Sequence, residues 1–201
     1  NPQANNIIIN NTIVSNITPI KINLSINDAN FAIGAVTASN ASSVSLSNAT
    51  TAPYWTAQTT ASALGCQQNG NCLIRIKATD SAGNVNNTET LTITVDSAPP
   101  SITGAAINDS NNIVKGSDVI NMSLGVTDSN NIISIKGNNA DFAQAGSAWN
   151  AVNKSSEFCS SEGLCTVALS VADNLSNSNS TQSFAFTIDN TAPLLAGIII
   201  N

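Results

Sequence analysis

The side chains with the most distinctive chemistry in this chain are four cysteines, which form two pairs of equal spacing. Cys66 and Cys72 recur 93 residues later as Cys159 and Cys165. The spacing predicts two disulfides, one within each pair, and disulfides persist mainly outside the cytosol. The alternative is four free buried thiols. Short C-x-x-C spacings and histidine are both absent from the sequence, so the usual zinc sites are not expected.

The aspartates form a second repeated set. Asp80 recurs as Asp173 and Asp96 recurs as Asp189, again 93 residues later. A carboxylate at the end of a strand caps a turn through hydrogen bonds to its own backbone, or it offers hard oxygen ligands to a cation. With few other acids, no histidine and paired cysteines, the common nucleophile–base pairs cannot be assembled. We therefore predict that the chain is not an enzyme.

The repeated residues belong to two tandem copies of one domain, predicted over residues 1–98 and 99–192. A third copy begins at the C-terminus, because residues 193–201 have the pattern of residues 2–10, and residues 100–108 have a weaker form of it. Residues 193–201 are expected to form the first strand of a next repeat, in a continuing chain or as a donated strand. Arrays of this kind usually hold or span something.

Alternating apolar and polar residues predict strands in both copies, because successive side chains of a strand point to opposite faces. The alternating runs cover residues 20–26, 74–78 and 91–95 in the first copy and 120–126, 167–171 and 184–188 in the second. No segment of comparable length has a helical period. A five-residue turn between the cysteines of each pair predicts that each disulfide lies across a β-hairpin. The predicted fold class is all-β, with one two-sheet sandwich in each copy.

Composition predicts a polar surface with few charges. Charged residues make up 9% of the chain and the net charge is −6, so no basic stripe is available to bind nucleic acid. Aromatic residues make up 4%, and we expect Trp55 and Trp149 in the cores rather than on a ligand-stacking surface. The apolar runs are far shorter than the roughly 20 residues of a membrane helix. We expect no membrane span or signal peptide in this segment, which reads as a mature fragment or a part of something longer.

Residues 77–84, Lys-Ala-Thr-Asp-Ser-Ala-Gly-Asn, and residues 91–100, Leu-Thr-Ile-Thr-Val-Asp-Ser-Ala-Pro-Pro, resemble the last two strands and linker of a known family. These are the tandem immunoglobulin-like repeat domains of bacterial and archaeal cell-surface proteins, including adhesin stalks, S-layer-type proteins and filament proteins. The second copy keeps residues 171–174 and 186–193 of the pattern but has lost the Ala-Gly-Asn of the turn. The resemblance covers essentially the whole chain and implies a rod of immunoglobulin-like sandwiches. Such modules serve many functions.

The strand order of this family implies a tentative calcium site. In that order, Asp28 and Asp128 end the second strand, and Asp96, Asp128 and Asp173 converge at the domain junction. Oxygen ligands at such a junction suit calcium. Turn capping by the same aspartates is the alternative, and no other cofactor is expected.

Eleven Asn-x-Ser/Thr sequons are candidates for N-linked glycans, which would help a surface with so few charges to stay soluble. They begin at Asn10, Asn16, Asn23, Asn40, Asn48, Asn86, Asn108, Asn121, Asn153, Asn174 and Asn179. We expect several to be occupied if the source is an archaeon or a eukaryote, and few in a typical bacterium.

Together these patterns predict a structural extracellular protein, the repeating unit of a cell-surface filament, stalk or surface layer that assembles head-to-tail with itself. The alternative is an adhesin or carbohydrate-binding module that recognises a receptor, a surface glycan or a neighbouring cell through polar loops. The first copy has a longer connection over residues 29–54, where such a binding surface is expected. An accessory domain of an enzyme is a third class.

Overall fold

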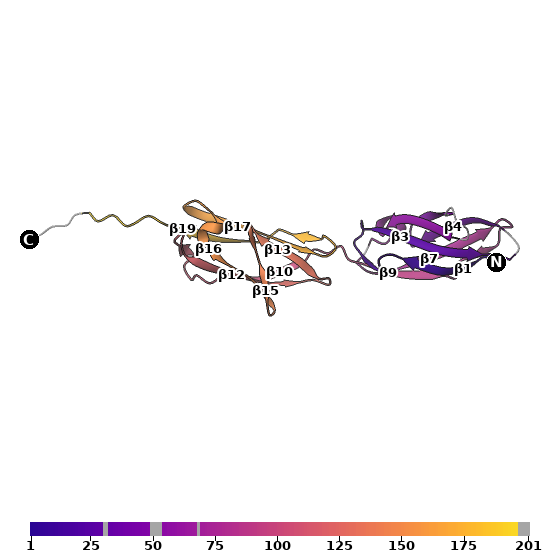
Figure 1. The fold of residues 1–201 in the computed structure, drawn as a ribbon, viewed down its shortest axis with the longest axis horizontal. Helices are drawn as coiled ribbons and strands as arrows, with labels where there is room; N and C mark the ends of the chain where they lie inside the picture. Colours follow the sequence, from indigo (N-terminus) through magenta and orange to yellow (C-terminus); the bar gives the residue numbers. More distant parts are fainter. Residues whose placement is uncertain (30–31, 49–53, 68, 197–201) are drawn as a thin grey trace, which may run out of the picture. The chain divides into compact units, whose positions relative to one another are not determined.

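The computed structural model describes residues 1–29, 32–48, 54–67 and 69–196. The chain divides into two compact units, Asn1–Ala98 (unit 1) and Pro99–Asn201 (unit 2). Each unit is an immunoglobulin-like β-sandwich, which confirms the predicted all-β fold class (Figure 1). Residues 193–196 are not in a strand, and the remainder of the strand predicted over 193–201 lies outside the described residues. Among the residues that the structure describes, no helix is long and apolar enough to cross a membrane.

The elements of unit 1 are β1 (Gln3–Ile9), β2 (Ile13–Val14), β3 (Pro19–Asn27), β4 (Ile33–Ser39), β5 (Ser43–Asn48), β6 (Tyr54–Thr60), the 3-10 helix η1 (Ser62–Leu64), β7 (Gly70–Asp80), β8 (Val85–Asn86) and β9 (Thr90–Val95). Those of unit 2 are β10 (Ser101–Ile107), β11 (Ile113–Val114), β12 (Val119–Thr127), β13 (Ile132–Gly137), β14 (Ala140–Asp141), β15 (Ala143–Ala145), β16 (Ala148–Lys154), α1 (Ser155–Phe158), β17 (Gly163–Asp173), β18 (Ser178–Asn179) and β19 (Ser183–Ile188).

The alternating runs form strands because one face of each sheet packs into the core. In β7, Ile74, Ile76 and Ala78 are buried, while the charged Arg75 is exposed between them. The core of unit 1 is built of Ile, Val, Leu and Ala together with the two disulfide cysteines. That of unit 2 also contains phenylalanines, of which Phe142 and Phe184 stack with their ring centroids 6.3 Å apart. The strands predicted from alternation are therefore confirmed.

The central strands of the two units pair in the same register. In unit 1, β7 pairs antiparallel with β9 from Gly70↔Val95 to Arg75↔Thr90. In unit 2, β17 pairs with β19 from Gly163↔Ile188 to Ala168↔Ser183. A short strand also runs parallel to the last strand of each unit, β2 beside β9 and β11 beside β19. The 93-residue repeat of the sequence is thus a repeat of strand pairing.

The first strand of each unit has a β-bulge at the same place. The register of β1 with β3 shifts between Asn5 and Ile8, and that of β10 with β12 shifts between Thr103 and Ala106. The bulge needs a residue with positive φ, which is Asn6 (φ 49°) in unit 1 and Gly104 (φ 58°) in unit 2. Asparagine and glycine are the residues that adopt this conformation most readily.

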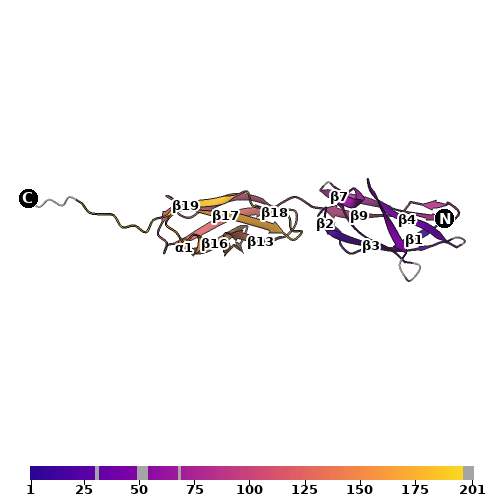
Figure 2. The same ribbon diagram turned by 90° about the horizontal axis from the view of Figure 1, so that it is seen from above.

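Within each unit the chain arrives at one end of the sandwich and leaves at the other. In unit 1, Pro2 lies beside β8 at the Asp80 end of β7, whereas Val95 pairs with Gly70 at the opposite end. Because β7 has 11 residues, these ends are separated by roughly 33 Å at about 3.3 Å per residue. The 11-residue strand β17 separates the two ends of unit 2 in the same way (Figure 2).

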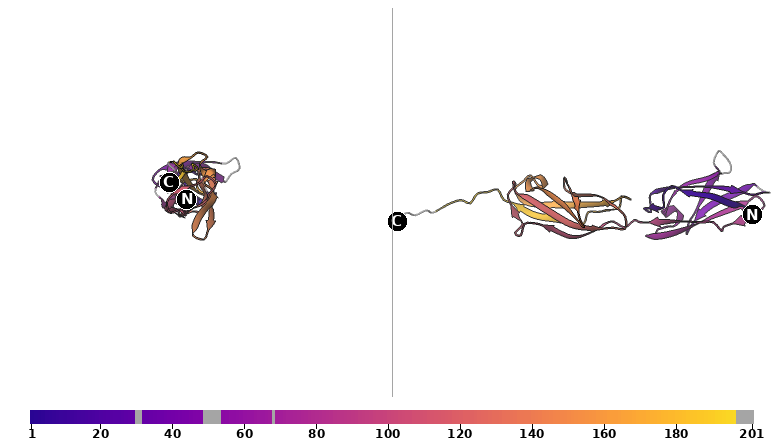
Figure 3. Two further views of the ribbon diagram at one scale, coloured as in Figure 1. Left: turned by 90° about the vertical axis from the view of Figure 1, so that its left-hand side faces the viewer. Right: turned by 60° about the horizontal axis from the view of Figure 1, so that its bottom comes forward.

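The two units differ at one edge of the sandwich. In unit 1, β5 pairs with β4 of one layer and, further along, with β6 of the other, so a single strand joins the two layers. In unit 2, β14 pairs with β13, β15 pairs with β16, and only Phe142 lies between these two short strands. The β15–β16 hairpin projects from the body of unit 2 (Figure 3). Residues 140–145 of unit 2 therefore also pass from one layer to the other, with the backbone N–H of Phe142 donating to the carbonyl of Ile135 on β13 at 3.0 Å, but the pairing is divided between two short strands.

Candidate functional sites

Both disulfides are formed, Cys66–Cys72 and Cys159–Cys165, with Cα–Cα distances of 5.7 and 5.8 Å. The prediction that each lies across a β-hairpin is wrong. The first cysteine of each pair follows a short helix, η1 or α1, and only the second lies on a strand. The bond therefore attaches a helical turn to β7 or β17, and it holds Leu64 or Phe158 of that turn over the core.

Gly65 explains how the chain reaches Cys66 from the preceding helix. It ends η1 in the left-handed region (φ 85°) and donates its backbone N–H to the carbonyl of Ser62. A β-carbon added here would lie 2.7 Å from the backbone nitrogen of Ser42 and from the β-carbon of Ala41. Both the conformation and the close approach of the chain therefore require glycine.

The repeated aspartates at the ends of β7 and β17 are caps of tight turns. Oδ1 of Asp80 accepts from the backbone N–H groups of Ala82 and Asn84, at 2.9 and 2.8 Å, and Oδ2 accepts from Nδ2 of Asn84 at 2.8 Å. Asp173 makes the same three bonds with the residues of its own turn. Both aspartates are buried. This geometry is the turn-capping arrangement that the sequence left as the alternative to a cation site.

The capping bonds determine the charge state of Asp80. Burial raises its pKa, but the hydrogen bonds from the side chain and backbone of Asn84 and from the backbone of Ala82 lower it by more. The negative charge of Asp28 acts in the same direction as burial. The net pKa lies below the ordinary value of 3.8, so Asp80 is a carboxylate over the whole physiological range.

The remaining members of the predicted calcium set also cap turns. Oδ1 of Asp128 accepts from the backbone N–H of Asn130 at 2.7 Å, and Oδ1 of Asp96 accepts from that of Ala98 at 3.0 Å. Asp189 binds the backbone N–H of Thr191 in the same manner. Asp128 and Asp173 belong to unit 2, whereas Asp96 ends the last strand of unit 1. Calcium at these three residues stays a prediction.

Two of the sequon asparagines fasten the chain where it arrives at each unit. Nδ2 of Asn86 donates to the carbonyl of Pro2 at 2.7 Å, and Nδ2 of Asn179 donates to that of Pro100 at 2.9 Å. The Oδ1 atom of Asn86 accepts from the backbone N–H of Thr88 and from its hydroxyl, and Asn179 binds Thr181 identically. We call this arrangement the asparagine clamp. It gives these two Asn-x-Thr sequences a structural role that was not predicted.

The other sequons differ in how much of the asparagine is available. Asn40 donates its Nδ2 to the carbonyl of Leu73 at 2.8 Å, and Asn23 and Asn121 are half-buried in β3 and β12. Asn10 and Asn108, in contrast, are exposed at equivalent positions after the first strand of each unit. Asn16, Asn153 and Asn174 are half-buried or exposed, and the sequon of Asn48 extends into residues outside the described ranges.

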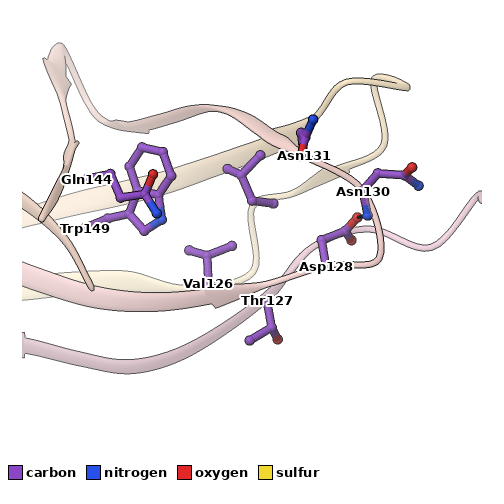
Figure 4. Close-up of a pocket in the computed structure, with 8 residues that line it drawn as sticks. Val126, Thr127, Asp128, Asn130, Asn131, Gln144 and Trp149 are labelled. Carbon is purple, nitrogen blue, oxygen red and sulfur yellow. Dashed lines mark hydrogen bonds between the residues drawn. The ribbon is translucent and has the colours of Figure 1, made fainter. Parts of the chain in front are cut away.

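A polar pocket lies at one end of unit 2 and has a volume of about 450 Å³. Trp149 and Gln144 stand at one end of it and Asp128 and Asn130 at the other, with Val126 between them (Figure 4). As predicted, both tryptophans pack against the cores, but each is only partly buried at the core edge. The pocket residues come from three stretches of the chain, within 126–132 and at Gln144 and Trp149, and no sequence motif pointed to them. The connection 29–54, where a binding surface was expected, lies partly outside the described residues.

Comparisons with solved structures found matches to fibronectin(III)-like modules and to adhesins. No protein-family model matches the sequence, and no curated protein matches it. The fibronectin(III)-like modules of Clostridium thermocellum CbhA align over 95% of this chain and 100% of their own, with a TM-score of 0.42 and 14% identity.

Two adhesins are also similar. A 1.5-MDa bacterial ice-binding adhesin matches 90% of this chain with a TM-score of 0.47 and 14% identity. The Escherichia coli adhesin FdeC matches 94% with a TM-score of 0.44 and 12% identity. The chain spans 63% and 64% of the lengths of these two adhesin structures. In structure, the chain is thus similar to tandem immunoglobulin-like and fibronectin-like modules of bacterial adhesins and other surface proteins.

Proposed function

We propose that this chain is a structural segment of an extracellular protein, a repeating spacer in a cell-surface filament, stalk or surface layer. The observation that carries the proposal is the path of the chain through each unit, which arrives at one end of the sandwich and leaves at the other. Each added copy then contributes its full length, roughly 33 Å along its longest strand, to the reach of the array.

The fastening of both ends of each unit supports this role. Where the chain arrives, the asparagine clamp binds it to the body of the sandwich. Where the chain leaves, the backbone N–H of Asn16 donates to the hydroxyl of Ser97 at 3.0 Å, and that of Gly116 donates to Oδ1 of Asn190 at 2.8 Å. A spacer keeps its length only if the segments that enter and leave it are bound to the body of the sandwich. Two disulfides favour an oxidising, extracellular location.

The location is tested by immunogold labelling of intact source cells with an antibody raised against residues 1–192. We expect gold particles on filaments, stalks or a surface layer outside the cell envelope. Label confined to the cytosol, or found only on free soluble protein in the medium, would overturn the proposal.

The same proposal includes head-to-tail assembly, either by a polypeptide that continues into further copies or by donation of residues 193–201 to another subunit. The sequence favours continuation, because residues 189–193 match the internal linker 96–100. Denaturing electrophoresis of native material separates the two: one very large chain supports continuation, and a ladder that begins at a two-domain mass supports donation. A native chain with no further such domains that also stays monomeric would exclude both.

For glycans, we propose acceptors at Asn10 and Asn108, one in each unit. Their Oδ1 atoms accept backbone N–H bonds from Lys21 and Asn121, at 2.6 and 2.8 Å, which holds each exposed side chain in place. The clamp residues Asn86 and Asn179 already use Nδ2, the atom to which a glycan is attached. Mass mapping of glycopeptides from native material tests the pattern. Occupancy of the clamp residues with unmodified Asn10 and Asn108 would contradict it.

Calcium at Asp96, Asp128 and Asp173 is a separate proposal and would change rigidity rather than activity. Small-angle scattering of the chain with calcium and with a chelator tests it. We expect a smaller maximum dimension or broader distribution with the chelator, without loss of folded signal. Identical curves would count against the site.

A further inference from the structure

The pocket of unit 2 combines three kinds of surface. Trp149 on β16 supplies an aromatic wall, and the half-buried Val126 and Ile132 supply apolar surface. Polar groups come from Gln144 on β15 and from Asp128 and the residues after it. Its volume of about 450 Å³ lies in the range of about 300–1,000 Å³ that is usual for small-molecule sites.

The chemistry of the lining selects a ligand class. Amide side chains donate and accept hydrogen bonds, and a carboxylate accepts them from hydroxyl groups. An indole packs against the C–H face of a sugar ring while polar neighbours bind its hydroxyls. Neither lysine nor arginine occurs among the described residues that line the pocket. A neutral polyol therefore fits, whereas an anionic sugar would meet the charge of Asp128 without a compensating cation.

Trp149 lies next to the stretch of chain that crosses between the two layers of unit 2. Ala140 and Asp141 pair with β13, and Gln144 pairs with Trp149 on β16. In unit 1, β5 makes the corresponding crossing, and Asn48 pairs with Trp55. The two tryptophans thus have an amide side chain as their neighbour at equivalent positions, which makes Asn48 the matched control for Gln144.

The geometry points to a binding site for one neutral hexopyranose residue in this pocket, with Trp149 against the ring and Gln144 and Asp128 on its hydroxyls. This adds ligand recognition to the proposed spacer role and does not depend on it. The assay is NMR titration of the ¹⁵N-labelled 201-residue chain with the methyl glycosides of glucose, galactose and mannose in excess EDTA, which removes calcium. The indole N–H of Trp149 and the amide of Gln144 are direct reporters.

We expect at least one glycoside to give saturable shifts at Trp149 and Gln144, while the indole of Trp55 does not move. Gln144→Ala and Asp128→Asn should each weaken the affinity about fivefold or more, the effect of losing roughly one hydrogen bond. Asn48→Ala, the matched change in unit 1, should leave it unchanged. The proposal is overturned if no glycoside saturates, if Trp55 shifts equally, or if Gln144→Ala binds like the parent chain. Spectral dispersion shows that each variant is folded.

Discussion

Unit 1 and unit 2 have the same central register but different edges. The pairing of β7 with β9 and of β17 with β19 is identical over six residue pairs, even though the units are closed differently. In unit 1 the single strand β5 pairs with both layers, while in unit 2 residues 140–145 cross between the layers as two short strands on either side of Phe142. The sandwich fold thus depends on the pairing of the central strands, whereas the number and length of the edge strands can differ between the units.

The cores of the two units also combine a shared central part with a different local structure at one end. Leu64 of η1 covers one end of the core of unit 1, and Phe158 of α1 does so in unit 2, although a glycine, Gly65, stands at the position that corresponds to Phe158. Two different turns therefore place an apolar side chain and a cysteine at equivalent positions of the two units. The two units share the disulfide that attaches this turn to the central strand, β7 or β17. They differ in the conformation of the turn before the first cysteine.

The largest expected effect comes from Gly65→Ala, which should destabilise unit 1 alone. The new β-carbon would lie 2.7 Å from Ala41 and Ser42, at a φ of 85°. We expect a loss of about 3 kcal/mol from the strained conformation and the clash together. Urea unfolding followed by Trp55 fluorescence in a Trp149→Phe background measures it.

The matched control is Gly83→Ala, which has nearly the same φ of 86° but no atom within 4 Å of the added carbon. It should cost only about 1 kcal/mol. Equal losses for the two variants would show that the packing of the loop against η1 contributes nothing.

Removal of the disulfides should affect both units alike. Each bond closes a loop of the same length, with a separation of 6 residues. The double change Cys66→Ala and Cys72→Ala should cost about 2 kcal/mol in the chain-entropy model, as should the corresponding change in unit 2. Unfolding of each unit is followed through its own tryptophan. A loss in one unit only would contradict the equivalence of the two attachments.

The asparagine clamps give the next effect. Asn86→Ala should lower the stability of unit 1 by about 1.5 kcal/mol, because the carbonyl of Pro2 and the groups of Thr88 lose their partner. Asn179→Ala should do the same in unit 2. Faster amide exchange near the first strand of the affected unit would locate the change there. Unchanged exchange would mean that the clamp does not hold the arriving chain.

The smallest effect concerns pH and Asp80. Its pKa is lower in the folded unit than in the unfolded chain, so the folded state holds the carboxylate more strongly. Its stabilising contribution is therefore fully present above the unfolded value of 3.8 and is lost as the pH falls through the lower folded pKa. Asp80→Asn should remove part of the acid dependence of unit 1 unfolding. An unchanged pH profile in that variant would refute the assignment.

The central strands were predictable because their alternation of apolar and polar residues extends over enough residues to be recognised. Runs such as residues 74–78 alternate without interruption, and each became a strand with one buried face. The helices η1 and α1 have 3 and 4 residues, too few to show a helical period. For that reason the disulfides were assigned to hairpins that do not exist. The cysteine spacing indicated the bonded pairs but contained no information on the preceding turn.

The polar sites were harder to predict, because their partners are distant in the sequence. Asn86 and Pro2 are 84 residues apart, so the Asn-x-Thr sequence was interpreted as a glycan signal. The recurrence of this sequence at the same point of both repeats, each with a proline at the start of its unit, was the available clue. The pocket beside Trp149 had no such clue, because its lining comes from β12, β13, β15, β16 and the connection after β12, which no sequence motif links.

The opposite placement of the two chain ends in each sandwich has a mechanical consequence. A pull on Pro2 and Val95 acts along the strands, whereas the ladder hydrogen bonds lie across them. The load therefore shears many bonds together instead of unzipping them one at a time. We expect each unit to resist stretching more strongly than its equilibrium stability alone would suggest.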